Sequence, residues 1–253
     1  MNAITALAPK AAPLPEGLSE LTYARLMRAS TATLTTILFK RGFRNCFLQG
    51  PRAINPAAVR VVGPAYTLRN IPAREDLDHL KVFEDNNHPQ RKAFEDMPAG
   101  HVMVIDSRGD ARAASAGSLL LTRLLRRGCA GIVTDGGFRD TPEIEKLALP
   151  AYHVRPTAPT NLILHHAVDV QVPIACGSVA VYPGDIIVGD GEGVVCIPAH
   201  LADSVAEESE TQTVYEDFVQ ERIDAGDKLF GLYPLTSPQQ AAAFEAWKTA
   251  RGR

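Results

Sequence analysis

The sequence predicts an α/β protein: a compact, α/β/α sandwich-like single domain with a long C-terminal helix. Three observations predict this class. Short apolar segments of strand length alternate with helical segments between residues 101 and 150. Short strand candidates, most of them separated by Gly or Pro, follow between residues 151 and 197. From Pro198 to Ala225 apolar residues recur at helical spacing, which predicts the long terminal helix.

Composition sets the outer limits. The chain has 253 residues, 45% apolar and 22% charged, and its 26 Lys and Arg against 29 Asp and Glu give a net charge of -3. No apolar run approaches the ~18 residues that a membrane span requires. The near-neutral charge argues against a general nucleic-acid-binding face. Residues 1–16, rich in Ala and Pro, are expected to form a flexible tail before one domain at residues 17–253.

The cysteines and the N-terminus bear on the cellular compartment. The four cysteines are scattered without a Cys-x-x-Cys pair, which argues against a zinc ribbon or a disulfide framework. The N-terminus lacks a charged region followed by a long apolar stretch, so it does not resemble a secretory signal. We therefore expect a cytoplasmic protein.

The N-terminal part predicts helices followed by strands. Apolar spacing between residues 19 and 41 predicts two helices, with Ser30 or Thr31 as the cap of the second. Residues 42–62 predict strand, turn and strand. The next strand is expected to be interrupted at Gly63-Pro64.

The middle of the chain predicts the repeating strand and helix order of an α/β unit. The expected elements are a loop with one short helix at 71–98, a strand at 101–106, a helix at 119–127 ended by Gly128, a strand at 130–134 and a helix capped by Thr141. In such units the ligand site lies at the carboxyl ends of the strands.

Two Gly-containing stretches meet this condition. Residues 114–118 lead into a helix, so their backbone N–H groups can bind a carboxylate or phosphate. The second strand ends in Asp135-Gly136-Gly137-Phe138-Arg139-Asp140, where two glycines allow a ligand to approach the backbone closely. The two stretches are therefore expected to form one site.

Arg139 and Asp140 determine the chemistry expected there. An arginine can clamp a carboxylate or keto oxygen through two hydrogen bonds. One carboxylate, completed by waters and substrate oxygens, is a usual way to bind Mg²⁺. Together the metal and the arginine could stabilise an enolate. The alternative is a surface Arg–Asp pair near a helix start.

The residues from Arg127 to Asp140 resemble the core of the RraA-like family. That family includes 4-hydroxy-4-methyl-2-oxoglutarate aldolases and proteins named as regulators of ribonuclease E activity. Its signature ends in Arg-Asp, two further residues and an acid, matched here by Arg139-Asp140-Thr141-Pro142-Glu143. The stretch from Tyr182 to Val195 resembles the family's closing strand pair. The likeness covers roughly residues 20 to 210.

The resemblance implies a fold, an assembly and a reaction. The fold is of the RraA-like type, assembled as a homotrimer or homohexamer with sites between subunits. The cofactor is Mg²⁺ or Mn²⁺, and the substrate is a 2-keto acid cleaved to pyruvate. Asp140 would be the metal ligand, and Arg139 would clamp the keto or enolate oxygen.

The resemblance also suggests substrate-binding and supporting residues. The substrate carboxylate would be bound by the backbone of Gly117, Ser118, Leu119 and Leu120. Asp190 or Glu192 of a neighbouring subunit would complete the metal shell. Asp135 and Glu143 are further supporting candidates.

Ser118 departs from the family pattern. The signature places an acid with twenty residues between it and Arg139, and that position is Ser118. In the aldolases this acid helps to hold the metal or its waters. Serine is a weaker ligand, so metal affinity or reaction type is expected to differ, and Asp106, Asp110 or Asp135 could compensate.

The leading hypothesis is a divalent-metal-dependent lyase that cleaves a small 2-keto acid and releases pyruvate. The same enolate chemistry could decarboxylate oxaloacetate. Ser118 keeps open a dehydratase acting on a sugar-derived 2-keto-3-deoxy acid. A rival from another class is a non-catalytic protein that binds ribonuclease E. Neither a membrane nor direct nucleic-acid binding is expected.

Overall fold

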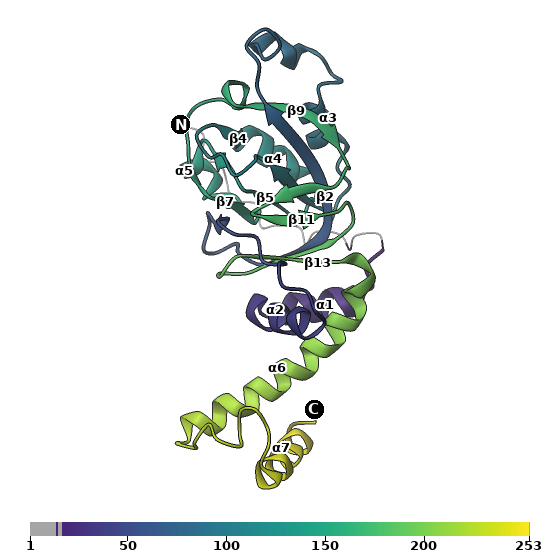
Figure 1. The fold of residues 1–253 in the computed structure, drawn as a ribbon, viewed down its shortest axis with the longest axis vertical. Coiled ribbons are helices and arrows are strands. Elements are labelled where there is room, and N and C mark those ends of the chain that lie inside the picture. Colours follow the sequence, from purple (N-terminus) through teal and green to yellow (C-terminus); the bar gives the residue numbers. More distant parts are fainter. Residues whose placement is uncertain (1–13, 15–16, 253) are drawn as a thin grey trace.

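A mixed sheet forms the centre of the protein (Figure 1). The computed structural model describes Leu14 and residues 17–252, so the tail expected at 1–16 lies outside the described residues except for Leu14. Within them the sheet has eight strands, in the order β1 (Arg52–Ala53), β7 (Ala151–His153), β5 (Gly131–Thr134), β3 (Val102–Asp106), β2 (Val61–Pro72), β12 (Ile186–Gly189) and β13 (Val194–Ile197), with β9 (His165–Val170) paired to β2.

Smaller elements surround this sheet. A hairpin is formed by β10 (Ile174–Cys176) and β11 (Val179–Val181), and a small sheet by β4 (Ala114–Ala116), β6 (Gly137–Phe138) and β8 (Arg155–Pro156). The helices are α1 (Glu20–Arg28), α2 (Thr31–Lys40), α3 (Pro89–Asp96), α4 (Ser118–Arg126), α5 (Thr141–Ile144), α6 (Ala202–Asp224) and α7 (Pro238–Arg251). Short 3-10 turns are η1 (Leu80–Glu84), η2 (Asn161–Ile163) and η3 (Ala199–Leu201).

The parallel strands β2, β3, β5 and β7 form the middle of the sheet, as the strand and helix order predicts. Alternate residues of β3 face different cores, because side chains alternate along a strand. Met103 and Ile105 pack in the cluster that contains α3 and α4, whereas Val102 and Val104 pack in the cluster that contains the β10–β11 hairpin. The protein is thus a single mixed α/β domain, as expected.

The strand around Gly63-Pro64 is continuous, so the predicted interruption is wrong. Pro64 lies opposite Ile186 of β12, and the neighbouring Ala65 N–H donates to the Asp185 carbonyl. Parallel pairing with β3 begins only at Ala65, so the missing N–H of Pro64 removes no ladder hydrogen bond. Residues 42–62 do not form a full pair of strands: they contain β1, one isolated bridge at Phe47 and the first two residues of β2.

The N-terminal helices and α6 pack together beside β12 and β13. Ser19 and Ser30 cap α1 and α2 through their hydroxyl oxygens, as the sequence predicts for the second helix. Their apolar faces share one core with α6 and β13. Figure 1 shows α6 continuing away from the sheet, with α7 folding back beside its far end.

The long C-terminal helix is therefore present, but α7 was not expected. Phe218 and Val219 of α6 pack with Leu232 and Phe244, which form a separate small core. Within the described residues, no helix combines the length and apolarity needed to cross a membrane.

Candidate active site

The parallel pair β4 and β6 brings the two Gly-containing stretches together. Their register aligns Ala116 with Phe138, and the Arg139 N–H donates to the Ala116 carbonyl at 3.1 Å. The residues that follow each strand, Gly117 on one side and Asp140 on the other, therefore lie next to each other. The register therefore brings together the two stretches that the sequence predicts to form one site.

The carboxylate of Asp140 lies at the N-terminus of α4. Its Oδ2 accepts hydrogen bonds from the Ser118 N–H at 3.2 Å and the Ser118 hydroxyl at 3.3 Å, and lies 3.7 Å from Arg139 Nε. The Asp140 backbone is left-handed (φ 57°, ψ 36°), which Asp tolerates better than most residues. Asp140 rather than the predicted Thr141 occupies the cap position of α5.

Gly117 allows this close arrangement. A Cβ atom at this position would lie 2.7 Å from Asp140 Oδ2 and 2.9 Å from Arg139 Nε, which is closer than real Cβ contacts. The φ of Gly117 is -133°, so the requirement comes from space and not from backbone conformation. Glycine is needed here because two charged side chains cross over its α-carbon.

Arg139 and Asp140 line a small cavity. Its volume is about 110 Å³, which is too small to enclose a nucleotide. The lining residues are Phe83, Gln90, Arg91, Ala114, Ala116, Gly117, Leu119, Leu120, Arg139, Asp140, Thr160 and Asn161. Arg139 and Asp140 are about half-exposed, so both can reach a ligand that enters from solvent.

The backbone predicted to bind the carboxylate is partly occupied. The Ser118 N–H donates to Asp140, and the Leu120 N–H donates to the Gly117 carbonyl at 3.1 Å. Between them, the Leu119 N–H has no acceptor among the described residues, and the Leu119 side chain is exposed. The start of α4 thus retains one donor in this turn for an anionic ligand.

A cluster of three buried hydroxyl groups holds β4 in place. Ser107, Ser115 and Thr134 are mutually hydrogen-bonded, with oxygen separations of 2.6 to 2.9 Å. A Cβ at Gly136 would collide with Ser107 and Ser115, so this glycine allows the cluster to close. The cluster fixes β4 against the ends of β3 and β5.

Asp135 is not among the residues that line the cavity. It is buried and accepts hydrogen bonds from the backbone N–H groups of Ser107, Gly109 and Gly177. Burial raises the pKa of Asp135, and the nearby Asp106 carboxylate adds to this effect. Asp135 joins three loops in this structure.

The other acids considered as ligands lie outside the cavity lining. Asp106 is buried and accepts from the Arg108 N–H, and burial raises its pKa. Asp110 is paired with Arg112, whose guanidinium holds the pKa of this carboxyl well below its usual range. Glu143 is exposed. Within residues 17–252, no group of three or more His, Cys, Asp or Glu is arranged to hold a metal.

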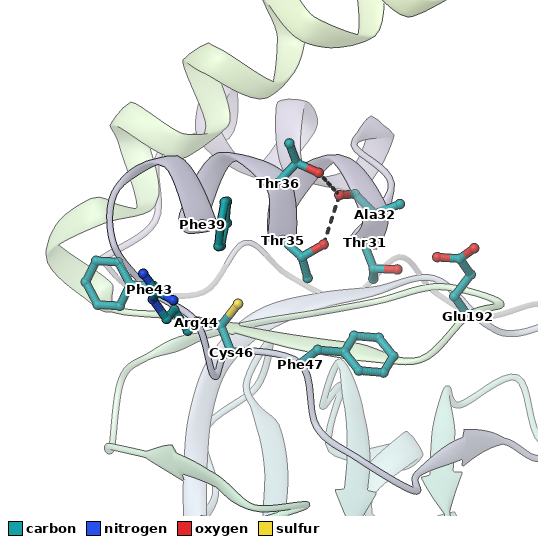
Figure 2. A pocket seen from close by; sticks show the side chains of 10 residues that line it. All are labelled: Thr31, Ala32, Thr35, Thr36, Phe39, Phe43, Arg44, Cys46, Phe47 and Glu192. Carbon is teal, nitrogen blue, oxygen red and sulfur yellow. Dashed lines mark hydrogen bonds between the residues drawn. The ribbon is translucent and has the colours of Figure 1, made fainter.

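A larger depression lies elsewhere, between α2 and the segment that leads to Phe47. Its volume is about 460 Å³, and Figure 2 shows Glu192 at one end and Phe43 and Arg44 at the other. The hydroxyls of Thr35 and Thr36 donate to the Ala32 carbonyl, so neither has a donor left for a ligand (Figure 2). The depression lacks an Arg–Asp pair like that of the smaller cavity.

The side chains of Asp190 and Glu192 lie in different surroundings. Asp190 accepts hydrogen bonds from the N–H and the hydroxyl of Thr31, at 2.7 and 2.9 Å, and lies 3.7 Å from Arg60. The exposed carboxylate of Glu192 has no hydrogen bond or ion pair among the described residues. Within one chain neither residue lines the smaller cavity.

Sequence reasoning missed the cavity residues of the 71–98 segment. Phe83, Gln90 and Arg91 come from η1 and α3, which the sequence identified only as a polar loop with one short helix. Asn161, which lies in η2, was missed as well. His88-Pro89 marks the start of α3, but neither spacing nor composition indicated that this helix faces the site.

A comparison with known families covers the part of the chain that contains this cavity. The model of the RraA-like family, described as Aldolase/RraA, matches residues 31–196. The chain belongs to the RraA-like family. The matched residues include β4, β6, α4 and both members of the Arg139–Asp140 pair. The helix α7 lies beyond the match.

Individual RraA-like relatives point to an aldolase-type lyase. A 4-hydroxy-4-methyl-2-oxoglutarate aldolase of Thermus thermophilus is 33% identical over 119 residues, 47% of this chain and 71% of that protein. A Halalkalibacterium halodurans protein, to which the same activity is ascribed by inference, is 33% identical over 163 residues, 64% of this chain and 71% of its own length.

A solved structure shows the same fold. Streptomyces coelicolor RraAS2, described as an unusual member of the RNase ES inhibitor RraA protein family, has a TM-score of 0.70 and 30% identity. The similarity covers 80% of this chain and 96% of that one. The RraA-like family thus includes relatives named for an enzyme activity and relatives named for inhibition of a ribonuclease.

Proposed function

We propose that this protein is a divalent-metal-dependent lyase that cleaves a small 2-keto acid and releases pyruvate. The observation that carries the proposal is the pairing of Arg139 with Asp140 in one small cavity at the start of α4. The names of the 33% identical relatives support an aldolase-type reaction. Oxaloacetate decarboxylation requires the same enolate and is part of the proposal.

The residues fit a magnesium or manganese ion that is shared with substrate. Mg²⁺ commonly binds one or two carboxylates and fills its remaining positions with water and substrate oxygens. Asp140 offers one half-exposed carboxylate, and the Ser118 hydroxyl lies 3.3 Å from it. When bound, the ion supplies positive charge close to the oxygens on which negative charge develops.

Arg139 orients the substrate. Its guanidinium can donate two hydrogen bonds in one plane to the keto oxygen and the adjacent carboxylate. Its Nε lies 3.7 Å from Asp140, so the arginine also aligns the carboxylate that would hold the ion. The Leu119 N–H, at the positive end of α4, would donate to the substrate carboxylate.

We further propose a homotrimer or homohexamer in which a neighbouring subunit supplies one carboxylate to the site. Glu192 is the better candidate, because Asp190 is already bonded to Thr31. The Glu192 carboxylate lies at the edge of the 460 Å³ depression and is exposed. Sedimentation would give the oligomeric state.

A second candidate function, binding of a ribonuclease without chemistry, follows from the likeness to RraAS2. The two candidates predict different results for one panel of assays. Pyruvate release would be measured from 4-hydroxy-4-methyl-2-oxoglutarate and other 4-hydroxy-2-keto acids and from oxaloacetate, with Mg²⁺, Mn²⁺ or EDTA, and dehydration would be followed on a 2-keto-3-deoxy sugar acid.

The lyase proposal expects metal-dependent pyruvate release that Arg139→Ala and Asp140→Asn each reduce by roughly a hundredfold or more. Asn also tolerates the left-handed backbone of residue 140, so the second variant removes charge with little change in shape. Inactivity throughout the panel together with tight ribonuclease binding would favour the second candidate. Unchanged turnover in both variants would remove the site assignment.

A further inference from the structure

A second guanidinium, that of Arg91, lines the cavity beside Arg139. Arg91 is the third residue of α3 and is half-buried. Among the described residues it forms no ion pair with any carboxylate. Burial, and then the positive charge of Arg139, lower the pKa of Arg91. The two like charges therefore interact across the cavity, and both remain protonated because arginine keeps its proton in proteins.

An aromatic ring holds Arg91 in one orientation. The Arg91 Cζ lies 4.2 Å from the centroid of the Phe83 ring, in a cation–π arrangement. Phe83 in turn contacts the His88 ring edge-to-face, with centroids 5.2 Å apart. The flat guanidinium is thus held against an aromatic ring, which reduces the entropy lost when it binds a ligand.

A buried hydrogen bond fixes α3 to the site. The Gln90 Nε2 donates to the Ser115 carbonyl at 2.9 Å, and both residues are buried. Ser115 precedes Gly117 by two residues in the strand that leads to α4. The position of Arg91 relative to Arg139 and Asp140 is therefore determined by the body of the protein and not by a loose loop.

The cavity consequently carries more positive than negative charge. Two guanidinium groups face it, and Asp140, which is paired with Arg139, is the one carboxylate among its described lining residues. A partly desolvated cation without a counter-ion is unfavourable, and an anionic ligand group would relieve this cost. A divalent ion on Asp140 would increase the positive excess further.

We propose that Arg91 is a specificity-determining residue that binds the second carboxylate of a dicarboxylic 2-keto acid. This inference rests on the proposed function, in which Arg139 and the start of α4 hold the keto-acid end. Arg91 binds the distal carboxylate through two parallel N–H···O hydrogen bonds, the geometry that a guanidinium favours. Dicarboxylic substrates are then preferred over sugar-derived 2-keto acids that carry a single carboxylate.

A matched pair of inert ligands tests this directly. 2-Oxoglutarate and 2-oxopentanoate have the same five-carbon 2-keto acid frame and differ in a terminal carboxylate or methyl group. Neither carries the 4-hydroxyl group that aldol cleavage requires, so calorimetry can measure binding in the presence of Mg²⁺ without turnover. The wild-type protein should bind 2-oxoglutarate at least roughly tenfold more tightly.

Variants at Arg91 complete the test. Arg91→Met should abolish the preference while leaving 2-oxopentanoate binding within roughly threefold, and Arg91→Lys should recover part of it. Arg126→Met is the matched control, because Arg126 is exposed on α4 and absent from the cavity lining. It should retain the full preference, and thermal unfolding of each variant would check the fold.

The proposal is overturned if the wild-type protein shows no preference or if Arg91→Met keeps it. Equal weakening of both ligands in Arg91→Met and in Arg91→Lys would also overturn it, because that pattern indicates general damage. These outcomes can be distinguished from a failure of the proposed lyase activity. A binding preference that depends on Arg91, without pyruvate release from any substrate, would reject the lyase and retain the carboxylate-binding role.

Discussion

The Asp140 carboxylate accepts hydrogen bonds from both the N–H and the hydroxyl of Ser118, at 3.2 and 3.3 Å. Ser118 is also the position at which the RraA-like signature expects an acid. The departure from the family pattern therefore occurs in direct contact with the expected metal ligand. The first turn of α4 stabilises the carboxylate by its dipole, and serine adds a neutral donor where the family adds a second negative charge.

Replacing Ser118 by aspartate should strengthen metal binding. A second carboxylate beside Asp140 adds a ligand of the type that Mg²⁺ prefers, and we expect the Mg²⁺ dissociation constant to fall by roughly tenfold or more. Calorimetric titration with Mg²⁺ measures this directly. Ser118→Asn is the isosteric neutral control and should not tighten binding. Equal affinities for Ser118→Asp and the wild-type protein would argue against a metal at Asp140.

Gly117→Ala should reduce activity without unfolding the protein. The added methyl group would lie 2.7 Å from Asp140 Oδ2 and 2.9 Å from Arg139 Nε, so one of these flexible, half-exposed side chains must move. Displacement of a positioned group by about 1 Å can cost roughly a hundredfold in rate, and we expect kcat/KM to fall by about that factor.

The control for Gly117→Ala is Gly191→Ala, at a glycine where a Cβ atom would meet nothing within 4 Å. Both variants should unfold at nearly the wild-type temperature in a thermal scan. A large loss of stability in Gly117→Ala alone would show that the glycine serves folding rather than the site. Normal turnover in a well-folded Gly117→Ala would contradict the assigned arrangement.

The sequence predicted the fold class and the region of the candidate site because both depend on local signals. Strand-length apolar segments predicted β3 and β5, and Gly128, with a φ of 76°, ends the helix before β5 as expected. The two Gly-containing stretches converge because their strands are parallel neighbours. These properties follow from short-range periodicity and from the rule for strand ends.

Other features could not be predicted, because they depend on contacts between distant segments. Pro64 fits in β2 because it lies where pairing with β12 ends and pairing with β3 begins. No local sequence pattern shows this position. Arg91 lines the cavity because a hydrogen bond from Gln90 to Ser115 holds α3 in place. These two residues are 25 positions apart. Asp190 and Glu192 are two positions apart, yet only the structure shows that the first is bonded to Thr31.

Asp190 and Glu192 should therefore give opposite results when replaced. Asp190→Ala removes the acceptor at the first turn of α2 and an ionic contact with Arg60, and should lower the free energy of unfolding by about 1–2 kcal/mol. Glu192→Gln changes an exposed group and should alter stability by no more than about 0.5 kcal/mol. Urea unfolding compares the two.

Turnover should show the reverse order for these variants. If Glu192 of a neighbouring subunit completes the site, Glu192→Gln should lower kcat by roughly tenfold or more at unchanged stability. Asp190→Ala should retain most of its activity at a temperature where it remains folded. A fully active Glu192→Gln would reject the shared-carboxylate proposal, and a destabilised one would show that its carboxylate has a structural role.

Acidification should destabilise the protein through His153. This buried side chain accepts a hydrogen bond from the Phe138 N–H at 3.3 Å through Nδ1 and stacks on the Phe138 ring, directly before Arg139. Burial lowers the pKa of His153 to about 4, against about 6.5 when unfolded. Between these values the unfolded chain binds the proton and the folded chain does not, so stability is lost as pH falls through this window at up to about 1.4 kcal/mol per pH unit.

Urea unfolding at about pH 7 and about pH 5 measures this loss, and His153→Gln isolates its source. Glutamine can still accept from the Phe138 N–H but cannot bind a proton in this range, so its loss between the two pH values should be smaller by about 2 kcal/mol. His88 and His165, whose pKa values burial also lowers, remain in both proteins and contribute equally to the two slopes. An identical pH dependence in the two proteins would show that folding does not lower the pKa of His153.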